Sequence, residues 1–310
     1  MPSTAPKAPR PERAPADGWP SALDAFLQRA GQLLDRIEAM SFAPCAVPDF
    51  AGHTAFRWRR QERGGSLQAV AHPHHIRLDD LCGIEAQKRR VDENTRQFLE
   101  GWPANNVLLT GARGTGKSSL VKALLNEYAG RGLRLIEVDR QDLTDLPDIV
   151  ALIGARPERF IVFCDDLSFE AAEPGYKALK VALDGSIASP SENVLIYATS
   201  KRRHLMPEYM AENLETRHVG EEVHPSEGVE EKISLSERFG LWVSFYPFDQ
   251  ESYLAIVEHC ARKLRVPARA RKAMREAALQ WALSRGSRSG RAAWQFARDY
   301  AGRLRLGARK

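Results

Sequence analysis

The sequence predicts an α/β protein in which a parallel sheet is covered by helices and followed by an all-helical region. Three observations lead to this prediction. Short apolar stretches alternate with helical patterns between residues 78 and 248, a glycine-rich loop joins one apolar stretch directly to a helix, and only helical patterns follow residue 248. Alternating strands and helices are typical of parallel sheets, because parallel neighbours need a crossover long enough to hold a helix.

The composition is that of a folded chain without a membrane span. Its 310 residues suffice for one large or two modest domains, with 43% hydrophobic and 27% charged residues. We find no apolar run of about 18 residues, and the N-terminus lacks the apolar core of a signal peptide. The four cysteines are widely spaced, without a Cys-x-x-Cys pair: Cys45, Cys82, Cys164 and Cys260. We therefore expect a cytoplasmic protein with reduced thiols rather than disulfides or a metal site.

The first 71 residues precede the regular pattern. Residues 1–20 repeat Pro, Ala and charged residues without an apolar period, so we expect a disordered tail. Ser21 has the position of a helix N-cap, and apolar residues at helical spacing predict a helix that ends near residue 40. Strand-like pieces at 56–58 and 67–70 lie in an otherwise irregular stretch. We therefore describe residues 21–71 as an N-terminal helix and an irregular region.

Residues 72–248 form the predicted α/β domain, and residues 249–310 the helical subdomain. Five strands are expected in one parallel sheet, over residues 106–110, 133–138, 160–164, 194–199 and 242–245. Helices are expected between them, over residues 85–99, 118–128, 145–155 and 176–183. A polar, acidic stretch over 207–231 precedes the fifth strand. The helical subdomain should contain helices over residues 250–264, 267–284 and 290–306.

The helical subdomain is strongly basic. Residues 261–310 carry 15 Lys and Arg against Glu276 and Asp299, whereas the whole chain has a net charge of +5. Such a region can meet nucleic acid, an acidic partner or ATP. An arginine-rich face exposed to solvent is the simpler interpretation, and we favour it. Trp281 and Trp294 lie among alanines, and we expect them in the helical core rather than as platforms that stack on bases.

The glycine-rich loop is the strongest functional signal. Residues 107–118 read Val-Leu-Leu-Thr-Gly-Ala-Arg-Gly-Thr-Gly-Lys-Ser, an apolar strand that runs into Gly-x-x-x-x-Gly-Lys-Ser and then a helix. The glycines let backbone N–H groups point at phosphate oxygens, and the helix N-terminus adds positive potential. Lys117 can then reach the β- and γ-phosphates, and the Ser118 hydroxyl can ligate Mg²⁺. The predicted nucleoside-triphosphate site comprises Gly111, Ala112, Arg113, Gly114, Thr115, Gly116, Lys117, Ser118 and Ser119.

Two carboxylates at the end of a later strand complete this site. Residues 160–166 read Phe-Ile-Val-Phe-Cys-Asp-Asp. A phosphate loop needs a carboxylate on the Mg²⁺ side, and Asp165 is placed for that role. Asp166 is placed to orient or deprotonate the attacking water.

These motifs together resemble the core of an AAA+ ATPase. The strand with the phosphate loop, the strand ending in Asp-Asp and a strand ending in Ala-Thr-Ser (198–200) occur in that order. Within the superfamily, residues 72–306 resemble a bacterial family of uncharacterised predicted AAA+ ATPases, a domain of unknown function. The matching stretches are 78–88, 164–170, 202–205 and 235–241. The resemblance implies a three-layer P-loop NTPase core with a five-stranded parallel sheet and a C-terminal helical lid, and ATP and Mg²⁺ as ligands.

Two positions depart from the superfamily pattern. The second acidic residue is usually Glu, and here it is the shorter Asp166. The residue that senses the γ-phosphate after the fourth strand is usually Asn, and here it is Lys201. Lysine can contact phosphate, but it cannot both accept from water and donate to phosphate as an amide can. The alternative is that Lys201 points to solvent and that Thr199 or Ser200 senses the phosphate.

Two functional positions of the superfamily are matched by arginines. Arg238, in Leu-Ser-Glu-Arg-Phe, matches the arginine finger, which would reach the γ-phosphate bound by a neighbouring subunit. Arg291 resembles the arginine of the lid's sensor motif, and Arg288 is the alternative for that role. The resemblance therefore implies a homo-oligomer.

The base pocket is expected at residues 74–83, the segment that lines it in AAA+ proteins. No Asn-Lys-x-Asp motif for guanine is evident. The histidines His72, His74 and His75 have no Cys or acidic pair at ligand spacing nearby, so we favour an exposed loop over a metal site.

Three functions remain open from the sequence. The leading one is an ATPase that remodels or switches an unknown partner, and the second is a nucleotide-dependent scaffold with little turnover. The third is a DNA-associated factor that uses the basic lid, which the absence of an appended DNA-reading motif disfavours. A small-molecule kinase is the outside alternative.

Overall fold

The computed structural model describes residues 23–33, 48–61, 64–169, 174–184, 191–201, 217–219, 222–224 and 235–307. The chain divides into two compact units, Met1–Ala46 and Val47–Lys310. In the first unit, residues 23–33 form a helix, and the remainder of the helix predicted up to residue 40 lies outside the described residues. Leu23, Phe26, Leu27 and Leu33 on this helix are all exposed.

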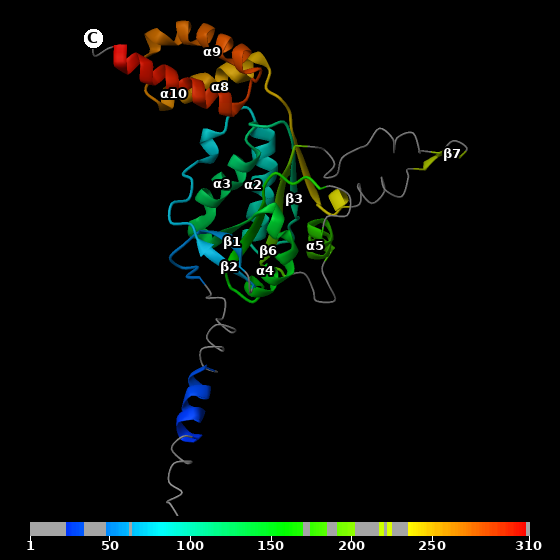
Figure 1. The fold of residues 1–310 in the computed structure, drawn as a ribbon. Helices are drawn as coiled ribbons and strands as arrows, with labels where there is room; N and C mark the ends of the chain where they lie inside the picture. The colour runs from blue at the N-terminus through cyan, green and yellow to red at the C-terminus, as the bar shows by residue number, and fades with distance from the viewer. Residues whose placement is uncertain are drawn as a thin grey trace, which may run out of the picture. The chain divides into compact units, whose positions relative to one another are not determined.

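The second unit contains a seven-stranded sheet (Figure 1). Its strands follow the order β2-β1-β4-β5-β6-β3-β9, and all neighbours are parallel except β1 and β2. Five of them are the predicted strands, within one residue at each end: β3 (Val107–Gly111), β4 (Leu133–Val138), β5 (Arg159–Cys164), β6 (Val194–Ser200) and β9 (Leu241–Phe245). The predicted α/β class is therefore confirmed.

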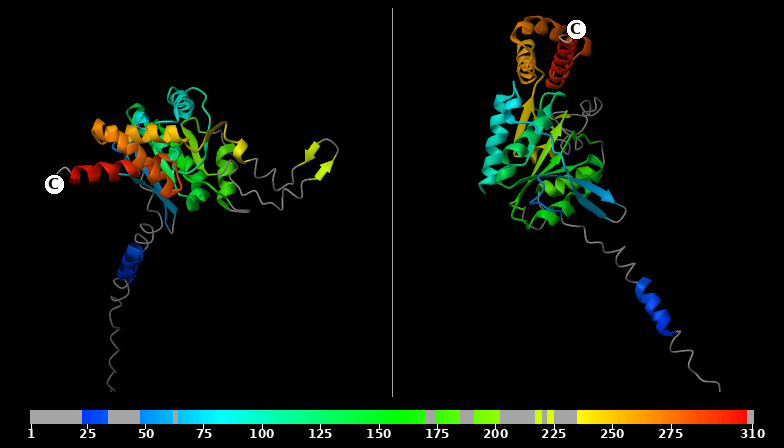
Figure 2. Two further views of the ribbon diagram at one scale, coloured as in Figure 1. Left: turned by 90° about the horizontal axis from the view of Figure 1, so that it is seen from above. Right: turned by 90° about the vertical axis from the view of Figure 1, so that its left-hand side faces the viewer.

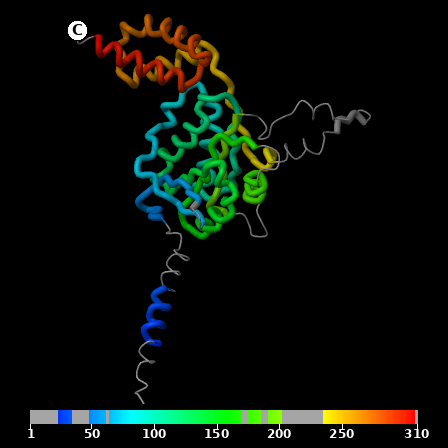
Figure 3. Tube along the Cα trace, viewed as in Figure 1, coloured from blue at the N-terminus to red at the C-terminus, as the bar shows by residue number. Residues whose placement is uncertain are grey.

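The predicted number of five strands is too low, because β1 (Ala55–Gln61) and β2 (Gly64–Ala69) extend the sheet beyond β4. They occupy the end of the sheet opposite β9 (Figure 3). Phe56 and Trp58 are buried, whereas Arg57 binds Glu137 in β4 and Arg59 binds Asp139 directly after β4. The sequence indicated only strand-like pieces at 56–58 and 67–70, because the acidic partners of the arginines lie 80 residues away.

Helices cover the two faces of the sheet (Figure 2). On one face lie α2 (Glu85–Leu99) and α3 (Lys117–Tyr128), which share a core with Val107, Leu109 and Phe163. On the other lie α4 (Leu146–Ile153) and α5 (Pro174–Asp184), which share a core with Leu108 and Val162. Because successive residues of a strand face opposite sides, continuous apolar strands such as β5 supply both cores.

The C-terminal helices form the lid. They are α8 (Gln250–Lys263), α9 (Arg271–Arg285) and α10 (Gly290–Gly307). Alanines such as Ala278 and Ala297 are fully buried and let the helices approach closely. Trp281 packs edge-on against Phe296, at 5.9 Å between ring centroids, as expected for the lid core. The expectation for Trp294 is wrong, because this side chain is 38% exposed.

Shorter elements connect these layers. Short 3₁₀ helices occupy η1 (Leu78–Asp80), η2 (Ala129–Arg131), η3 (Arg140–Asp145) and η4 (Ala268–Ala270). In the predicted acidic stretch, β7 (Arg217–Val219) pairs antiparallel with β8 (Glu222–His224). Among the described residues, no helix has the length and apolar character that a membrane span requires.

Candidate nucleotide-binding site

The phosphate loop connects the end of β3 to the start of α3. Its glycines Gly111 and Gly114 have φ angles of 124° and 74°, in the region that side chains disfavour. A Cβ at Gly111 would lie 1.9 Å from the carbonyl oxygen of Phe245, on the neighbouring strand β9. Only glycine therefore allows the loop to leave the strand at this point.

Lys117, the first residue of α3, lies over the loop and is only 8% exposed. Its Nζ donates hydrogen bonds of 2.7 Å to the carbonyl oxygens of Gly111 and Ala112. Burial lowers the pKa of this ammonium group, and the charges of Asp165 and Asp166 act in the opposite direction. The loop thus holds its lysine by two backbone contacts that phosphate oxygens can replace.

The metal side of the site is a hydrogen-bonded group of three side chains. Ser118 Oγ and Thr199 Oγ1 each donate to Asp165 Oδ1 at 2.6 Å. Asp165 follows β5 and Thr199 lies at the end of β6, its neighbour in the sheet. Hydroxyl and carboxylate oxygens are suitable Mg²⁺ ligands. The predicted pair Ser118 and Asp165 therefore lies together, and Thr199 joins it.

Asp166 and Lys201 form an ion pair beside this group. Asp166 has a φ of 57°, unusual for a residue with a side chain, and its backbone N–H donates to Thr199 Oγ1 at 2.8 Å. Its carboxylate accepts from Lys201 Nζ. Lys201 therefore contacts Asp166, the second acidic residue, and Thr199 contacts Asp165, the first. Neither of the two alternatives considered from the sequence included the pair of Lys201 and Asp166.

The lid contacts the phosphate loop directly. The backbone N–H of Gly290, at the start of α10, donates to the carbonyl oxygen of Gly114 at 2.9 Å. A Cβ on Gly114 would lie 2.9 Å from Ser289 and 3.4 Å from Arg291 Cβ. Arg291 lines the cavity described next, as expected of a lid arginine, whereas Arg288 is not among the described residues that line it.

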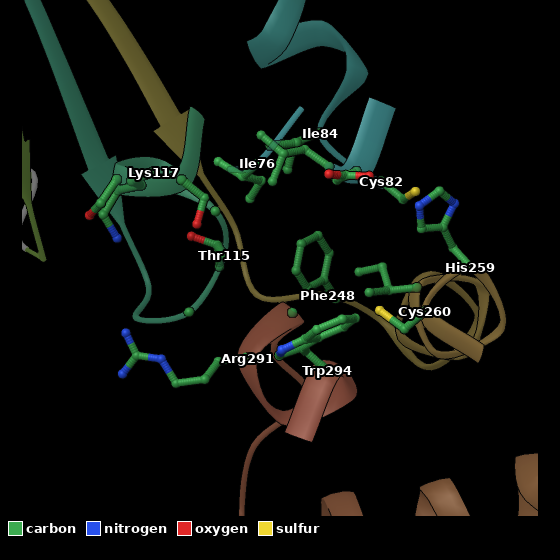
Figure 4. Close-up of a pocket in the computed structure, with 18 of the residues that line it drawn as sticks. Ile76, Cys82, Ile84, Thr115, Lys117, Phe248, His259, Cys260, Arg291 and Trp294 are labelled. Atoms are coloured by element: carbon green, nitrogen blue, oxygen red, sulfur yellow. The ribbon is translucent and has the colours of Figure 1, made fainter. Parts of the chain in front are cut away.

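A cavity of about 600 Å³ lies between the phosphate loop, residues 74–84 and the lid. Figure 4 shows Lys117 and Arg291 toward one end, and Cys82, His259 and Cys260 toward the other. Its apolar middle is formed by Ile76, Ile84, Phe248 and Trp294. A charged end and an apolar middle fit the phosphates and the base of a nucleotide. The segment expected to line the base pocket does line this cavity.

The cysteines at the described positions are thiols. Cys82, Cys164 and Cys260 are free, and Cys45 lies outside the described residues. Burial raises the pKa of Cys260 to about 11 and also raises that of Cys82. Both groups are therefore protonated at neutral pH and serve as apolar lining of the cavity.

The three histidines line two neighbouring cavities. His75 lines the nucleotide cavity, His72 lines a neighbouring cavity of about 340 Å³, and His74 lines both. Among the described residues, no cluster of three or more His, Cys, Asp or Glu side chains has the arrangement of a metal site.

Arg238 lies outside this cavity, three residues before β9. Its Nε donates to both carboxylate oxygens of Asp184, at 2.6 and 2.7 Å. Because β9 runs parallel to β3, with Leu241 opposite Val107 and Phe245 opposite Gly111, Arg238 lies beyond the strand ends that are remote from the phosphate loop.

Comparison with known proteins identifies the family. A family model described as "Protein of unknown function (DUF815)" matches residues 51–304. The chain belongs to the DUF815 family. Proteasome-activating nucleotidase 2 of Haloferax volcanii is 30% identical to it over 149 residues, which are 40% of this chain and 33% of that relative. The DUF815 chain thus spans about one third of the length of this curated relative.

Solved structures show the same fold. Two mutant forms of RuvB from Thermotoga maritima superimpose with TM-scores of 0.51 and 0.50 at 15% sequence identity. Each match covers 75% of the DUF815 chain and 66% or 67% of the RuvB chain. The predicted AAA+ fold and the predicted membership of an uncharacterised AAA+ family are therefore confirmed.

Proposed function

We propose that this chain is a Mg²⁺-dependent ATPase that couples ATP binding and hydrolysis to the remodelling or switching of a partner. The group formed by Ser118, Asp165 and Thr199 carries the proposal. It supplies oxygen ligands beside a phosphate loop whose lysine is already in place. The group lies at the carboxyl ends of parallel strands, which is where nucleotides usually bind in α/β proteins.

Different residues of the chain bind the phosphates, hold the metal and accept the proton. Lys117 exchanges the carbonyl oxygens of Gly111 and Ala112 for phosphate oxygens, and Arg291 contributes a second positive charge from the lid. Bound Mg²⁺, held through Ser118 and Asp165, would neutralise charge on the β- and γ-phosphates. Asp166 accepts a proton from the attacking water in the general-base role.

The ion pair between Asp166 and Lys201 supports slow turnover. A base that is already bound to an ammonium group must change partner before it can orient water. The same pair favours the second candidate function, a nucleotide-dependent scaffold that binds ATP and scarcely hydrolyses it. A measured turnover number decides between the two.

The basic lid gives less support to a DNA-associated function. Several of its cations already have partners within the chain: Arg275 binds Glu258 and Glu251, Arg303 binds Asp299, and Lys263 binds Asp80. We therefore keep nucleic acid as a possible partner, ranked below a protein client.

Binding is tested by thermal unfolding with and without Mg²⁺ and ATP. ATP at about a hundredfold over its dissociation constant should stabilise the fold by roughly 2.7 kcal/mol. Lys117→Ala should remove this stabilisation, because the loop then lacks the ammonium group that binds the phosphates. Lys122→Ala, about one turn along α3 and outside the nucleotide cavity, is the matched control. A wild-type chain that ATP does not stabilise would contradict the proposal.

A further inference from the structure

A second cavity, of about 340 Å³, lies beside the nucleotide cavity. It is formed where the hairpin of β1 and β2 extends the sheet beyond β4 (Figure 1). Its walls come from this hairpin and the following residues 70–74, from α3, and from β4 and β5. The hairpin is additional to the five strands predicted for the sheet, and the proposed ATPase function gives this cavity no role.

The lining of the second cavity is positively charged. Arg57 and Arg59 lie two residues apart on β1, hence on the same face of the strand, and they line the cavity together with Lys122 of α3. Glu137 is the one acid among the described residues that line it. Three positive charges against one negative give a net charge of +2, without counting the histidines. A concave site of one charge sign concentrates ions of the opposite sign.

Much of this charge is not taken up by partners within the chain. Arg57 donates from Nε and Nη2 to Glu137 Oε2, at 3.2 and 2.6 Å, and this contact compensates the carboxylate. Arg59 donates from Nη1 to Asp139 at 3.2 Å. Lys122 makes no ion pair or side-chain hydrogen bond with any residue that the structure describes. The Lys122 ammonium group and the other N–H groups of the two arginines can therefore donate to an anion.

A phosphate monoester matches this lining better than a carboxylate does. Its charge at neutral pH is about −1.5 to −2, close to the charge that the lining would balance, and its three oxygens accept from guanidinium and ammonium groups. The rest of the lining is largely apolar and includes Val70, Leu125, Leu135 and Phe163. The volume is at the lower end of the range for ligand pockets, roughly 300–1,000 Å³. The lining thus fits a small molecule with one phosphate group and an apolar body.

The two cavities share a wall. His74 lines both of them, and Ile76 lines the nucleotide cavity. Asn126 on α3 donates from Nδ2 to the carbonyl oxygens of His74 and Ile76, at 2.8 Å each. The segment between the cavities is therefore fixed to the helix that carries both Lys117 and Lys122. A ligand in the second cavity contacts a segment that also shapes the nucleotide cavity.

We propose that the second cavity binds a small organic phosphate through Arg57, Arg59 and Lys122, and that its occupant changes the affinity of the neighbouring cavity for ATP. The binding site follows from the cavity and its charges, whereas the effect on ATP rests on the proposed function as well.

The site is tested by calorimetric titration of the full chain, saturated with Mg²⁺ and a non-hydrolysable ATP analogue so that the phosphate loop is occupied. The probes are phenyl phosphate, inorganic phosphate without the body, and benzoate with a single charge. We expect phenyl phosphate to bind most tightly. Equally tight benzoate would overturn the phosphate class, and equally tight inorganic phosphate would overturn the organic body. No binding of any probe would overturn the site.

Two variants locate the bound probe. Lys122→Ala should weaken phenyl phosphate about 10- to 100-fold, the range for a hydrogen bond to a charged group, and it leaves no acid without a partner. Arg59→Gln should also weaken the probe, and it carries the test if Lys122→Ala does not fold. Lys177→Ala on α5, on the other face of the sheet, is the control and should bind as the wild type does. Wild-type affinity in both Lys122→Ala and Arg59→Gln would overturn the assignment.

The effect on ATP needs a separate measurement. The dissociation constant of the ATP analogue is compared with and without saturating phenyl phosphate, and coupled sites typically change it about 5- to 150-fold. Competition at the phosphate loop would act equally on the wild type and on Lys122→Ala. A shift in the wild type that Lys122→Ala lacks is therefore the expected result, and equal shifts in both would overturn the coupling.

The failure of this inference can be told from the failure of the proposed function. A wild-type chain that does not bind the ATP analogue removes the proposed function and the coupling. Titration of Lys117→Ala with phenyl phosphate then tests the second cavity by itself, because the phosphate loop lacks its ammonium group. A chain that binds the analogue and none of the three probes removes this inference alone.

Discussion

The two ends of the central sheet carry the two halves of the proposed site, and they differ in how complete they are within one chain. At the carboxyl ends of β3, β5 and β6, Lys117, Ser118, Asp165 and Thr199 are bonded to one another or to the loop. At the opposite end of β9, Arg238 is bonded to Asp184, remote from that group. In the proposed function, the first end supplies the groups for binding and the general base Asp166, and the second supplies the arginine finger.

This difference predicts that binding and turnover separate. A single chain should bind ATP with its own loop, lid and metal ligands. Hydrolysis should need a second chain, because the charge that grows on the γ-phosphate is met by an arginine that the first chain cannot supply. Variants at the two ends should therefore fail in different measurements.

The largest expected effect is that of Arg238→Ala. Arginine fingers contribute about 10³–10⁵ in rate in related phosphoryl-transfer systems, so kcat should fall at least about a thousandfold. The dissociation constant for ATP should remain at the wild-type value, because Arg238 lies outside the cavity. Steady-state phosphate release and equilibrium binding measure the two quantities, with exposed Arg269→Ala as the control. Loss of ATP binding in Arg238→Ala would contradict the expected separation of ATP binding from hydrolysis.

Lys201→Asn tests the phosphate-loop end of the sheet. The change removes the ion pair with Asp166 and supplies an amide that can accept from water and donate to phosphate. We expect kcat to rise on the order of tenfold, less than the 10²–10⁴ that a fully engaged general base contributes. Steady-state phosphate release measures the change. A lower kcat would show that the lysine itself assists hydrolysis.

The parts predicted from sequence are those that lie within one short stretch. Gly111 to Ser118 and Asp165 are predicted site residues because each motif is a local pattern that has a known chemistry. The bonds that Thr199 makes to Asp165 and to the backbone of Asp166 were out of reach, because they depend on β5 and β6 being neighbours. The sequence offered one signal, the polar end Ala-Thr-Ser of a buried strand.

The other differences between the predictions and the structure also depend on contacts between distant parts of the chain. Arg57 and Arg59 belong to a strand because Glu137 and Asp139 lie beside them, and the sequence places these acids 80 residues away. Trp294 is exposed because it lies on the face of α10 that lines the cavity with Arg291, whereas Ala293 and Ala297 lie on the buried face. In both cases tertiary contacts decided the outcome and local pattern did not.

Gly114→Ala is expected to have the smallest effect. A side chain there meets Ser289 at 2.9 Å and a φ of 74°, so the cost of strain should be about 1–3 kcal/mol. Because the phosphate loop contacts α10 at this point, ATP should bind several-fold more weakly while the oligomeric state stays the same. Gly130→Ala is the matched control, since a Cβ there has no neighbour within 4 Å. Urea unfolding and equilibrium binding measure the pair, and equal behaviour of the two variants would contradict the contact between loop and lid.

A mixture of two inactive variants tests whether the ATPase site is shared between two chains. Lys117→Ala lacks the loop lysine and Arg238→Ala lacks the finger, so neither should hydrolyse ATP alone. In a mixed assembly, an intact loop meets an intact finger at some interfaces. We predict that phosphate release returns on mixing and increases with protein concentration, as it should for the wild type. A mixture that stays inactive while wild-type activity per molecule is constant down to monomeric dilution would show that each chain acts alone.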